Sequence, residues 1–141
     1  MKIIRKKRDF VCDGAEYTLI DDNGKICASL KVETCSDYYY EEFSRFNVLY
    51  LHSFSTIEGE RNKGYGRKLL TNVIFRYKGK YDMIFLQCCP YYHKNEECIY
   101  LPPSDGLPKD KLIKFYKSCG FRVFKQQDRE HEFWTPMILK Y

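Results

Sequence analysis

The sequence predicts an α/β fold in a single domain, with helices packed on a mixed β-sheet. The length of 141 residues fits one domain and leaves little room for a second. Two segments have apolar residues at helical spacing, and each lies between segments patterned as strands. A helix that links two strands in this way acts as a crossover. The thirteen Tyr and ten Phe can fill a substantial core, because large rings bury much surface at low side-chain entropy cost.

The first part of the chain predicts three strands. Residues 16–21 form the first, and a turn at Asp22-Asn23-Gly24 follows it, where Gly tolerates a positive φ. The second strand has one buried face, because apolar residues alternate with polar ones at Ile26, Ala28, Leu30 and Val32. Residues 35–44 are polar and rich in Tyr, so we expect a loop. Residues 48–54 are apolar on both sides, which predicts a central strand.

The second part predicts two helices and three further strands. The first helix is indicated by apolar residues at Leu69, Leu70, Val73, Ile74 and Tyr77, and it ends at Lys78-Gly79-Lys80. Residues 83–88 then form a short buried strand. The second helix has its apolar stripe at Leu112, Phe115, Tyr116 and Cys119, and Gly120 ends it. Residues 121–125 and 133–139 form a terminal pair of strands. Pro136 cannot donate to a ladder, so we expect the last strand to lie at an edge or to contain a bulge.

Residues 89–109 are expected to form a long irregular loop, with four of the five prolines of the chain. A loop of this length in a small domain is more often functional than incidental. Cys88, Cys89, His93 and Cys98 lie in or beside it, and their spacing matches no common zinc pattern. We therefore expect no metal site.

The charge of the chain is concentrated near its start. The net charge is +5, and much of the excess lies in residues 2–8. We expect residues 1–15 to form a basic N-terminal arm that is solvated or loosely ordered. Contact with nucleic acid or with an acidic partner is the alternative for this segment, and the sequence does not decide between these readings.

The cysteines and the apolar segments indicate a cytoplasmic protein. Seven Cys are an odd number, which argues against a closed disulfide framework, so we expect reduced thiols. The first residues do not have the pattern of a secretory signal. No uninterrupted apolar stretch is long enough to span a bilayer, so we expect no membrane partner.

The turn Arg61-Asn62-Lys63-Gly64-Tyr65-Gly66 predicts an anion site. It leads from a strand into a helix, so successive backbone N–H groups and the positive end of the helix dipole point to one place. Gly64 and Gly66 let the backbone approach an anion closely, and Arg67 and Lys68 add charge. A Walker loop ends in Gly-Lys-Ser/Thr, whereas Gly66 is followed here by Arg67 and Lys68, so this motif is excluded. A dinucleotide fingerprint is excluded because Leu69 stands where its third Gly belongs. The simpler alternative is a strand-to-helix turn eased by glycine.

A second motif, Phe115-Tyr116-Lys117-Ser118-Cys119-Gly120-Phe121, follows at the end of the second helix. Together the two motifs resemble those of the GNAT acyltransferase superfamily, which has Arg/Gln-x-x-Gly-x-Gly/Ala after a strand and Tyr-x-x-x-Gly-Phe at the end of its last helix. The resemblance implies a GNAT-like domain over residues 16–141, with the central sheet splayed between two middle strands and helices on both faces. The strand and helices that usually begin such domains are shortened here.

The resemblance also implies a cofactor site for acetyl-CoA as co-substrate, without a metal. The backbone of Phe54, Ser55 and Thr56 would bind the pantetheine and polarise the acyl carbonyl. The pyrophosphate would be held by residues of the glycine turn, namely Arg61, Asn62, Lys63, Gly64, Tyr65, Gly66 and Arg67.

The same resemblance suggests catalytic roles for two residues. Tyr116 matches the general acid that protonates the departing thiolate, and its alternative role is that of a core aromatic. His52 partly matches a catalytic base of serotonin N-acetyltransferase, and its alternative role is that of a structural histidine. Glu58 and Glu60 are further candidates for the base, although they are more simply surface carboxylates.

The sequence thus predicts an N-acetyltransferase that transfers the acetyl group of acetyl-CoA to the amine of a small molecule or protein by direct attack. A catalytically inactive GNAT-fold module that binds CoA or a protein is the alternative. A nucleic-acid-binding domain is a third hypothesis, which the aromatic residues alone do not support. A homodimer is compatible with the sequence, because a partner subunit could close the acceptor groove.

Overall fold

The computed structural model describes residues 1–8, 13–34, 40–56, 63–88, 92–94, 97–99, 109–124 and 135–141. The chain divides into two compact units. The N-terminal unit comprises Met1–Phe85 with Lys140–Tyr141, and the C-terminal unit comprises Leu86–Leu139. None of the helices in these ranges has the length and apolar character that a membrane crossing requires.

Four antiparallel strands form most of the sheet in the N-terminal unit. They are β1 (Lys2–Arg8), β2 (Asp13–Ile20), β3 (Ile26–Thr34) and β4 (Val48–Thr56). The turn between β2 and β3 is closed by the carboxylate of Asp21, which accepts the N–H groups of Asn23 and Lys25 at 2.9 Å each. The predicted strands are confirmed, and Ala28, Leu30 and Val32 are buried as the alternation predicts. The alternation is wrong at the start of β3, where Ile26 is 48% exposed and Cys27 is buried, because the register between β2 and β3 shifts at Leu19 and Ile20.

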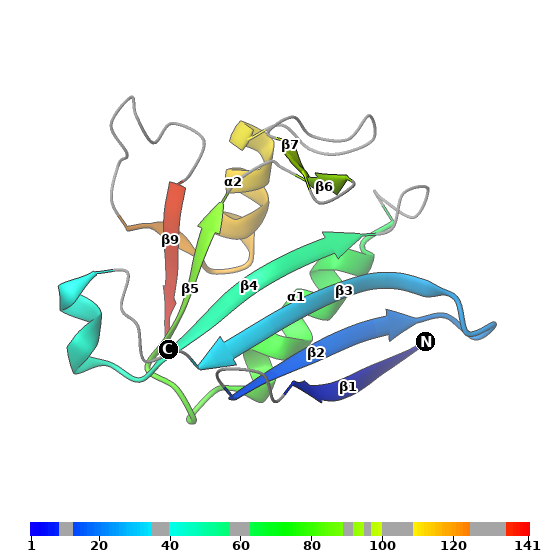
Figure 1. Ribbon diagram of the computed structural model, residues 1–141, viewed down its shortest axis with the longest axis horizontal. Helices are drawn as coiled ribbons and strands as arrows, with labels where there is room; N and C mark the ends of the chain where they lie inside the picture. Colours follow the sequence, from blue (N-terminus) through cyan, green and yellow to red (C-terminus); the bar gives the residue numbers. More distant parts are fainter. Residues whose placement is uncertain are drawn as a thin grey trace. The chain divides into compact units, whose positions relative to one another are not determined.

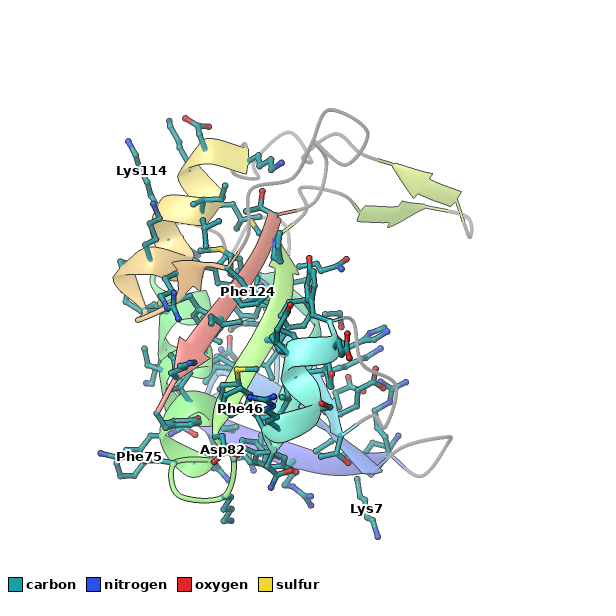
Figure 2. All side chains as sticks on the ribbon, turned by 90° about the vertical axis from the view of Figure 1, so that its left-hand side faces the viewer. Lys7, Phe46, Phe75, Asp82, Lys114 and Phe124 are labelled. Carbon is teal, nitrogen blue, oxygen red and sulfur yellow. The ribbon has the colours of Figure 1, made fainter. Side chains whose placement is uncertain are left out.

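Helix α1 (Tyr65–Arg76) covers one face of this sheet and contacts β2, β3 and β4 (Figure 1). Its buried residues Leu69, Leu70 and Val73 recur at helical spacing, as the sequence predicts. The opposite side of the helix is solvated, and Figure 2 shows Phe75, which is 76% exposed, projecting outward. At the end of the helix, the hydroxyls of Tyr77 and Tyr17 lie 2.8 Å apart, which ties α1 to β2.

Two segments of the N-terminal unit differ from the sequence expectation. Lys2–Arg8 forms the edge strand β1 instead of a loosely ordered arm, because all seven of its residues pair in register with β2. Glu41–Arg45, within and beside the expected loop, forms a short 3₁₀ helix. Its Phe43 is 1% exposed and packs edge-on against Phe85, with 5.0 Å between ring centroids.

Strand β5 (Met83–Cys88) runs parallel to β4. Their ladder comprises the pairs Val48–Met83, Leu49–Ile84 and Tyr50–Phe85. β4 continues from Leu51 to Thr56 beyond the last of these pairs while it remains paired with β3. This early end of the ladder agrees with the prediction that the sheet opens between its two middle strands.

The C-terminal unit contains helix α2 (Lys109–Ser118) and strands β8 (Arg122–Val123) and β9 (Thr135–Lys140). Strands β6 (Tyr92–Lys94) and β7 (Glu97–Ile99) pair as a separate antiparallel hairpin, within the segment that was expected to be irregular. The strand order of the main sheet is β1-β2-β3-β4-β5-β9-β8. A mixed sheet with helices is therefore confirmed.

The position of β9 overturns one of the two alternatives expected for the strand with Pro136, namely an edge strand. β9 lies between β5 and β8 and is not an edge strand. The neighbouring strand β8 is only two residues long. Just beyond it the carbonyl of Pro136 accepts the N–H of Phe124 at 2.8 Å. The proline thus contributes the acceptor of this bond, although it has no N–H to donate in return.

Candidate functional site

The end of β4 and the first turn of α1 lie against each other at Gly66. A Cβ built on Gly66 would lie 3.0 Å from Cζ of Phe54 and 3.1 Å from Oγ1 of Thr56. Contacts this short leave no room for a side chain at position 66 unless a neighbour moves. The structure thus brings together Phe54, Thr56 and Gly66, three of the residues predicted for the cofactor site.

Gly64 directs the chain into the helix. Its φ is +79°, in the left-handed region that favours glycine. Its carbonyl accepts the N–H of Lys68 at 3.0 Å, which is the first hydrogen bond of α1. Gly64 has no side chain to cap this end, and no acidic residue lies in the first turn. The start of any α-helix presents N–H groups that no carbonyl within the helix accepts, so this end is suited to an external anion.

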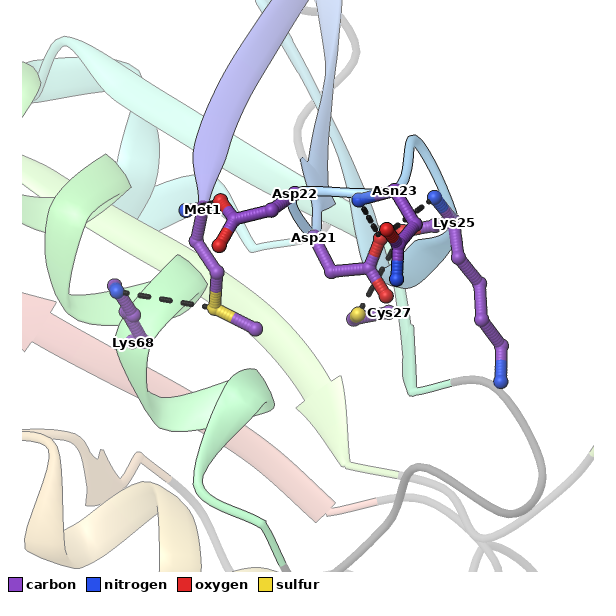
Figure 3. Close-up of polar contacts among 7 residues, drawn as sticks. All are labelled: Met1, Asp21, Asp22, Asn23, Lys25, Cys27 and Lys68. Atoms are coloured by element: carbon purple, nitrogen blue, oxygen red, sulfur yellow. Dashed lines mark hydrogen bonds and ion pairs between the residues drawn. The ribbon is translucent and has the colours of Figure 1, made fainter.

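Basic side chains surround the start of α1. Lys63, Arg67 and Lys68 are exposed, and the positive end of the helix dipole adds to their charge. Figure 3 shows the carboxylate of Asp22 at the turn between β2 and β3. The amino group of Met1, 2.8 Å from Asp22, lowers the pKa of this carboxyl, and Lys68 contributes further. The potential at the turn therefore favours a negatively charged group.

His52 lies at a bulge in β4. Lys31 of β3 pairs with Ser53, and the next residue, Val32, pairs with Leu51. His52 is thus an extra residue with no partner in the register of β3, and its side chain is exposed. A bulge of this kind turns a strand and redirects its side chains. The imidazole is accessible to solvent, as a base for an external amine must be.

Ser55 and Thr56 follow the bulge and complete β4. Ser55 pairs with Ser29 of β3, and their hydroxyl oxygens lie 3.5 Å apart. Thr56 pairs with Ala28 on the side that faces α1. The outer end of β4 therefore carries small hydroxyl side chains beside the start of the helix.

Tyr116 lies in α2 of the C-terminal unit and is 6% exposed. Its ring packs edge-on against Phe115 and Phe121, with centroid separations of 5.5 Å and 5.8 Å. Burial raises the pKa of its phenol well above the ordinary value, and the neighbouring Cys88 and Cys119 contribute in the same direction. The phenol therefore keeps its proton at neutral pH. This burial agrees with the role of a core aromatic, and a protonated phenol also satisfies the role of an acid.

Several residues predicted for the site lie outside the described residues. Arg61 and Asn62 of the glycine turn and the alternative bases Glu58 and Glu60 belong to this group. Of the four residues weighed as metal ligands, Cys88 alone has a described side chain. Within the described part of the chain, no group of three or more His, Cys, Asp or Glu residues is placed to hold a metal ion.

Sequence reasoning missed one cluster beside the sheet. Tyr17 is 2% exposed and shares a hydrogen bond with Tyr77. Hydrogen bonding to Tyr17 raises the pKa of the Arg5 guanidinium, with a further contribution from Tyr77. The guanidinium carbon of Arg76 lies 5.5 Å from the centroid of the Tyr17 ring. The bulge at His52 was missed too, although the consecutive polar residues His52-Ser53 in an apolar strand signal it.

Comparisons with known proteins agree with this geometry. A family model described as an acetyltransferase (GNAT) domain matches residues 13–123. A comparison with curated proteins finds no match. Among solved structures, PH1933 from Pyrococcus horikoshii is similar at 22% identity with a TM-score of 0.57, over 89% of this chain and 64% of that chain.

Two further solved structures are similar to the chain. One is a histone acetyltransferase HPA2 and related acetyltransferase from Corynebacterium glutamicum, at 16% identity with a TM-score of 0.61, over 91% of this chain and 65% of that chain. The other is a chain of the NatC complex bound to Gag peptide and CoA, at 15% identity with a TM-score of 0.59, over 89% of this chain and 70% of that chain. The chain thus spans just under two thirds of the length of the first structure. At these identities the likeness concerns the fold.

Proposed function

The chain belongs to the GNAT acetyltransferase family, and from this membership we propose that it transfers an acetyl group from acetyl-CoA to a primary amine. The observation that carries the proposal is the contact of Gly66 with the end of β4. Through this contact, the basic start of α1 lies beside Phe54 and Thr56, which would bind the acetyl donor. Acetyl-CoA carries a pyrophosphate between its adenosine and pantetheine parts, which matches an anion site next to an extended strand.

The donor would bind along β4 and into the start of α1. The backbone of Phe54, Ser55 and Thr56 would pair with the pantetheine amides. The pyrophosphate would lie at the first turn of α1, held by the backbone around Gly64–Gly66 and by nearby cations. The cations and polar residues of this group are Arg61, Asn62, Lys63, Tyr65 and Arg67.

The proposed reaction is direct attack of the amine on the thioester carbonyl. The C–N bond forms first, and the negative charge on the carbonyl oxygen would be stabilised by backbone N–H groups at the end of β4. The C–S bond then breaks and the sulfur departs with its electron pair. Holding amine and thioester together supplies much of the rate enhancement.

Proton transfers accompany this reaction. His52 would take the proton that the ammonium must lose before it attacks as a neutral amine, with Glu58 or Glu60 as alternatives. Tyr116 would give a proton to the thiolate of CoA, and the second proton that the nitrogen loses as the amide forms would restore Tyr116. The exposure of His52 and the retained proton of Tyr116 support these roles.

A second candidate is a GNAT-fold module that binds CoA or a protein without catalysis. The observation that favours it is the 6% exposure of Tyr116, which is typical of a core residue. In that case Tyr116 would contribute to packing, and replacing it would change stability and not turnover.

Release of the CoA thiol in a screen of small amines and of peptides with free N-terminal or lysine amines tests the proposal. We expect thiol release that depends on both acetyl-CoA and one class of amine, and a matching gain of 42 Da (about one acetyl group) on that acceptor. Binding of acetyl-CoA without release to any amine would favour the non-catalytic module. Absence of binding would overturn both candidates.

A further inference from the structure

Strand β1 is a regular edge of the sheet. It stands at one end of the strand order, and in the described part of the chain β2 is its only neighbour. All seven of its residues pair with β2 without a register shift, and the segment contains no proline. In an antiparallel pair, alternate residues direct their N–H and C=O groups away from the neighbouring strand. β1 therefore presents an ordered row of backbone donors and acceptors to the outside.

This edge is strongly cationic. Five of the seven residues of β1 are Lys or Arg, and none is acidic. The cations occur on both faces, because Arg5 pairs with Tyr17 on the side that faces α1, whereas Lys6 pairs with Glu16 on the other. Figure 2 shows Lys7 projecting away from the ribbon. Ile4, which is 46% exposed, adds an apolar contact on the same face as Lys6.

The cationic strand is held in place from one side. Arg5 pairs with Tyr17 across the β1–β2 ladder, Tyr17 and Tyr77 raise the pKa of its guanidinium, and those two hydroxyls lie 2.8 Å apart. This network joins β1, β2 and the end of α1. A partner that paired with β1 would therefore meet a strand whose backbone is already ordered, which lowers the entropy cost of association.

A second copy of the chain is a poor partner for this edge. If two β1 strands paired antiparallel about Arg5, the two Arg5 residues would face each other and Lys2 would face Arg8. Like charges directly opposite each other destabilise a strand pair. The charges thus oppose self-association, and they favour an extended segment whose acidic side chains lie opposite these cations.

The observations favour a peptide over a nucleic acid. A nucleic acid would use the charge of β1 but could not complete its row of backbone hydrogen bonds. β1 also contains no aromatic residue on which a base could stack. We infer that β1 docks an acidic, extended segment of a partner protein, which joins the sheet as an additional strand. This binding surface does not depend on the transferase activity proposed above.

A peptide titration of the full chain tests the inference. The probe is a fluorescent eight-residue peptide that alternates Glu and Val, with both ends blocked. The control peptide has the same sequence and charge, but alternate backbone nitrogens are methylated. It therefore cannot complete the hydrogen bonds of a strand ladder. We expect the first peptide to bind, to slow amide hydrogen exchange in residues 2–8, and to weaken as salt rises. We expect at least tenfold weaker binding of the methylated peptide.

Paired variants locate the binding surface. Replacing Lys2 and Lys6 by Gln should weaken peptide binding about two- to thirtyfold, since the change removes two exposed ion pairs. The control replaces the exposed Lys114 (Figure 2) and the exposed Lys117 of α2 by Gln, which removes the same charge and should leave binding unchanged. Neither variant touches the residues proposed to hold acetyl-CoA.

Three results would overturn the inference. One is equal binding of the methylated and unmethylated peptides, because charge alone would then explain it. Another is equal weakening by the β1 and α2 variants. The third is preferential binding of a single-stranded oligonucleotide of the same net charge, which would assign the edge to nucleic acid. Each is a binding result, so failure here is distinguishable from failure of the transferase proposal.

Discussion

The absence of a side chain at Gly66 allows the start of α1 to rest on the end of β4. We predict that Gly66→Val lowers the free energy of unfolding by about 1–3 kcal/mol, because the added atoms would overlap Phe54 and Thr56. It should also lower the affinity for acetyl-CoA, since the turn must move outward. Urea unfolding and calorimetric titration measure the two effects.

Gly64 supplies the matched control for this substitution. A Cβ on Gly64 meets nothing within 4 Å, but its φ of +79° is strained for any other residue. Gly64→Ala should therefore cost roughly 1 kcal/mol through backbone conformation alone. Equal effects of both variants on affinity would contradict a steric role for position 66.

For Tyr116, the decisive measurement compares turnover with stability. If its phenol protonates the thiolate, Tyr116→Phe should lower kcat by roughly 10²–10⁴-fold and leave KM for acetyl-CoA nearly unchanged. An unchanged kcat would assign Tyr116 to the core. A variant that loses stability in proportion to its loss of activity would point to the same conclusion.

The raised pKa of Tyr116 also predicts how stability depends on pH. An unfolded tyrosine loses its proton near pH 10, whereas the buried phenol keeps it to a higher pH. Its stabilising contribution is therefore complete below about pH 10 and declines above that value by up to roughly 1.4 kcal/mol per pH unit. Urea unfolding from pH 8 to 11 should show a shallower decline for Tyr116→Phe. An identical slope would show that this phenol ionises in the native state.

At the scale of elements, the hydroxyl contact between Tyr17 and Tyr77 joins β2 to the end of α1. We predict that Tyr77→Phe lowers the free energy of unfolding by about 1–3 kcal/mol, because it deprives the buried Tyr17 hydroxyl of one partner. The double variant Tyr17→Phe/Tyr77→Phe should cost less than the sum of the single changes. Additive costs in this double-mutant cycle would mean that the two hydroxyls do not interact.

The elements that the sequence predicted are those with internal periodicity. Alternation in β3 and helical spacing in α1 follow from burial of one face, so the pattern alone locates them. β1 has no such alternation, so its sequence does not reveal a strand. Its conformation depends on pairing with β2. The hairpin β6–β7 is similarly local and short, and three residues per strand leave no pattern to detect.

The sequence also predicted only part of the candidate site. The glycine turn identified Gly64 and Gly66, since each position needs a backbone or a space that only glycine provides. The extra residue at His52 is a property of pairing between β3 and β4, which the sequence of one strand does not specify. Nor does the sequence specify that Phe54 is the ring nearest to Gly66.

For the whole molecule, binding of the donor should be measurable as stability. A ligand at 100 times its Kd that binds only the folded state adds about 2.7 kcal/mol to the free energy of unfolding. We therefore predict that millimolar acetyl-CoA raises Tm by several degrees for a chain of this size. Differential scanning fluorimetry measures the shift, with Gly66→Val as the variant in which it should shrink. An unchanged Tm at saturating acetyl-CoA would remove the basis for both candidate functions.

The close approach of Phe54 to Gly66 also constrains how this protein can diverge. In a related gene, a larger residue at position 66 would be tolerated after Phe54 had been exchanged for a smaller one, and in the opposite order it would be selected against. The two positions should therefore covary across distant descendants, although twelve positions separate them in the sequence. Selection would thus conserve the summed side-chain volume at positions 54 and 66 more strongly than the identity of either residue.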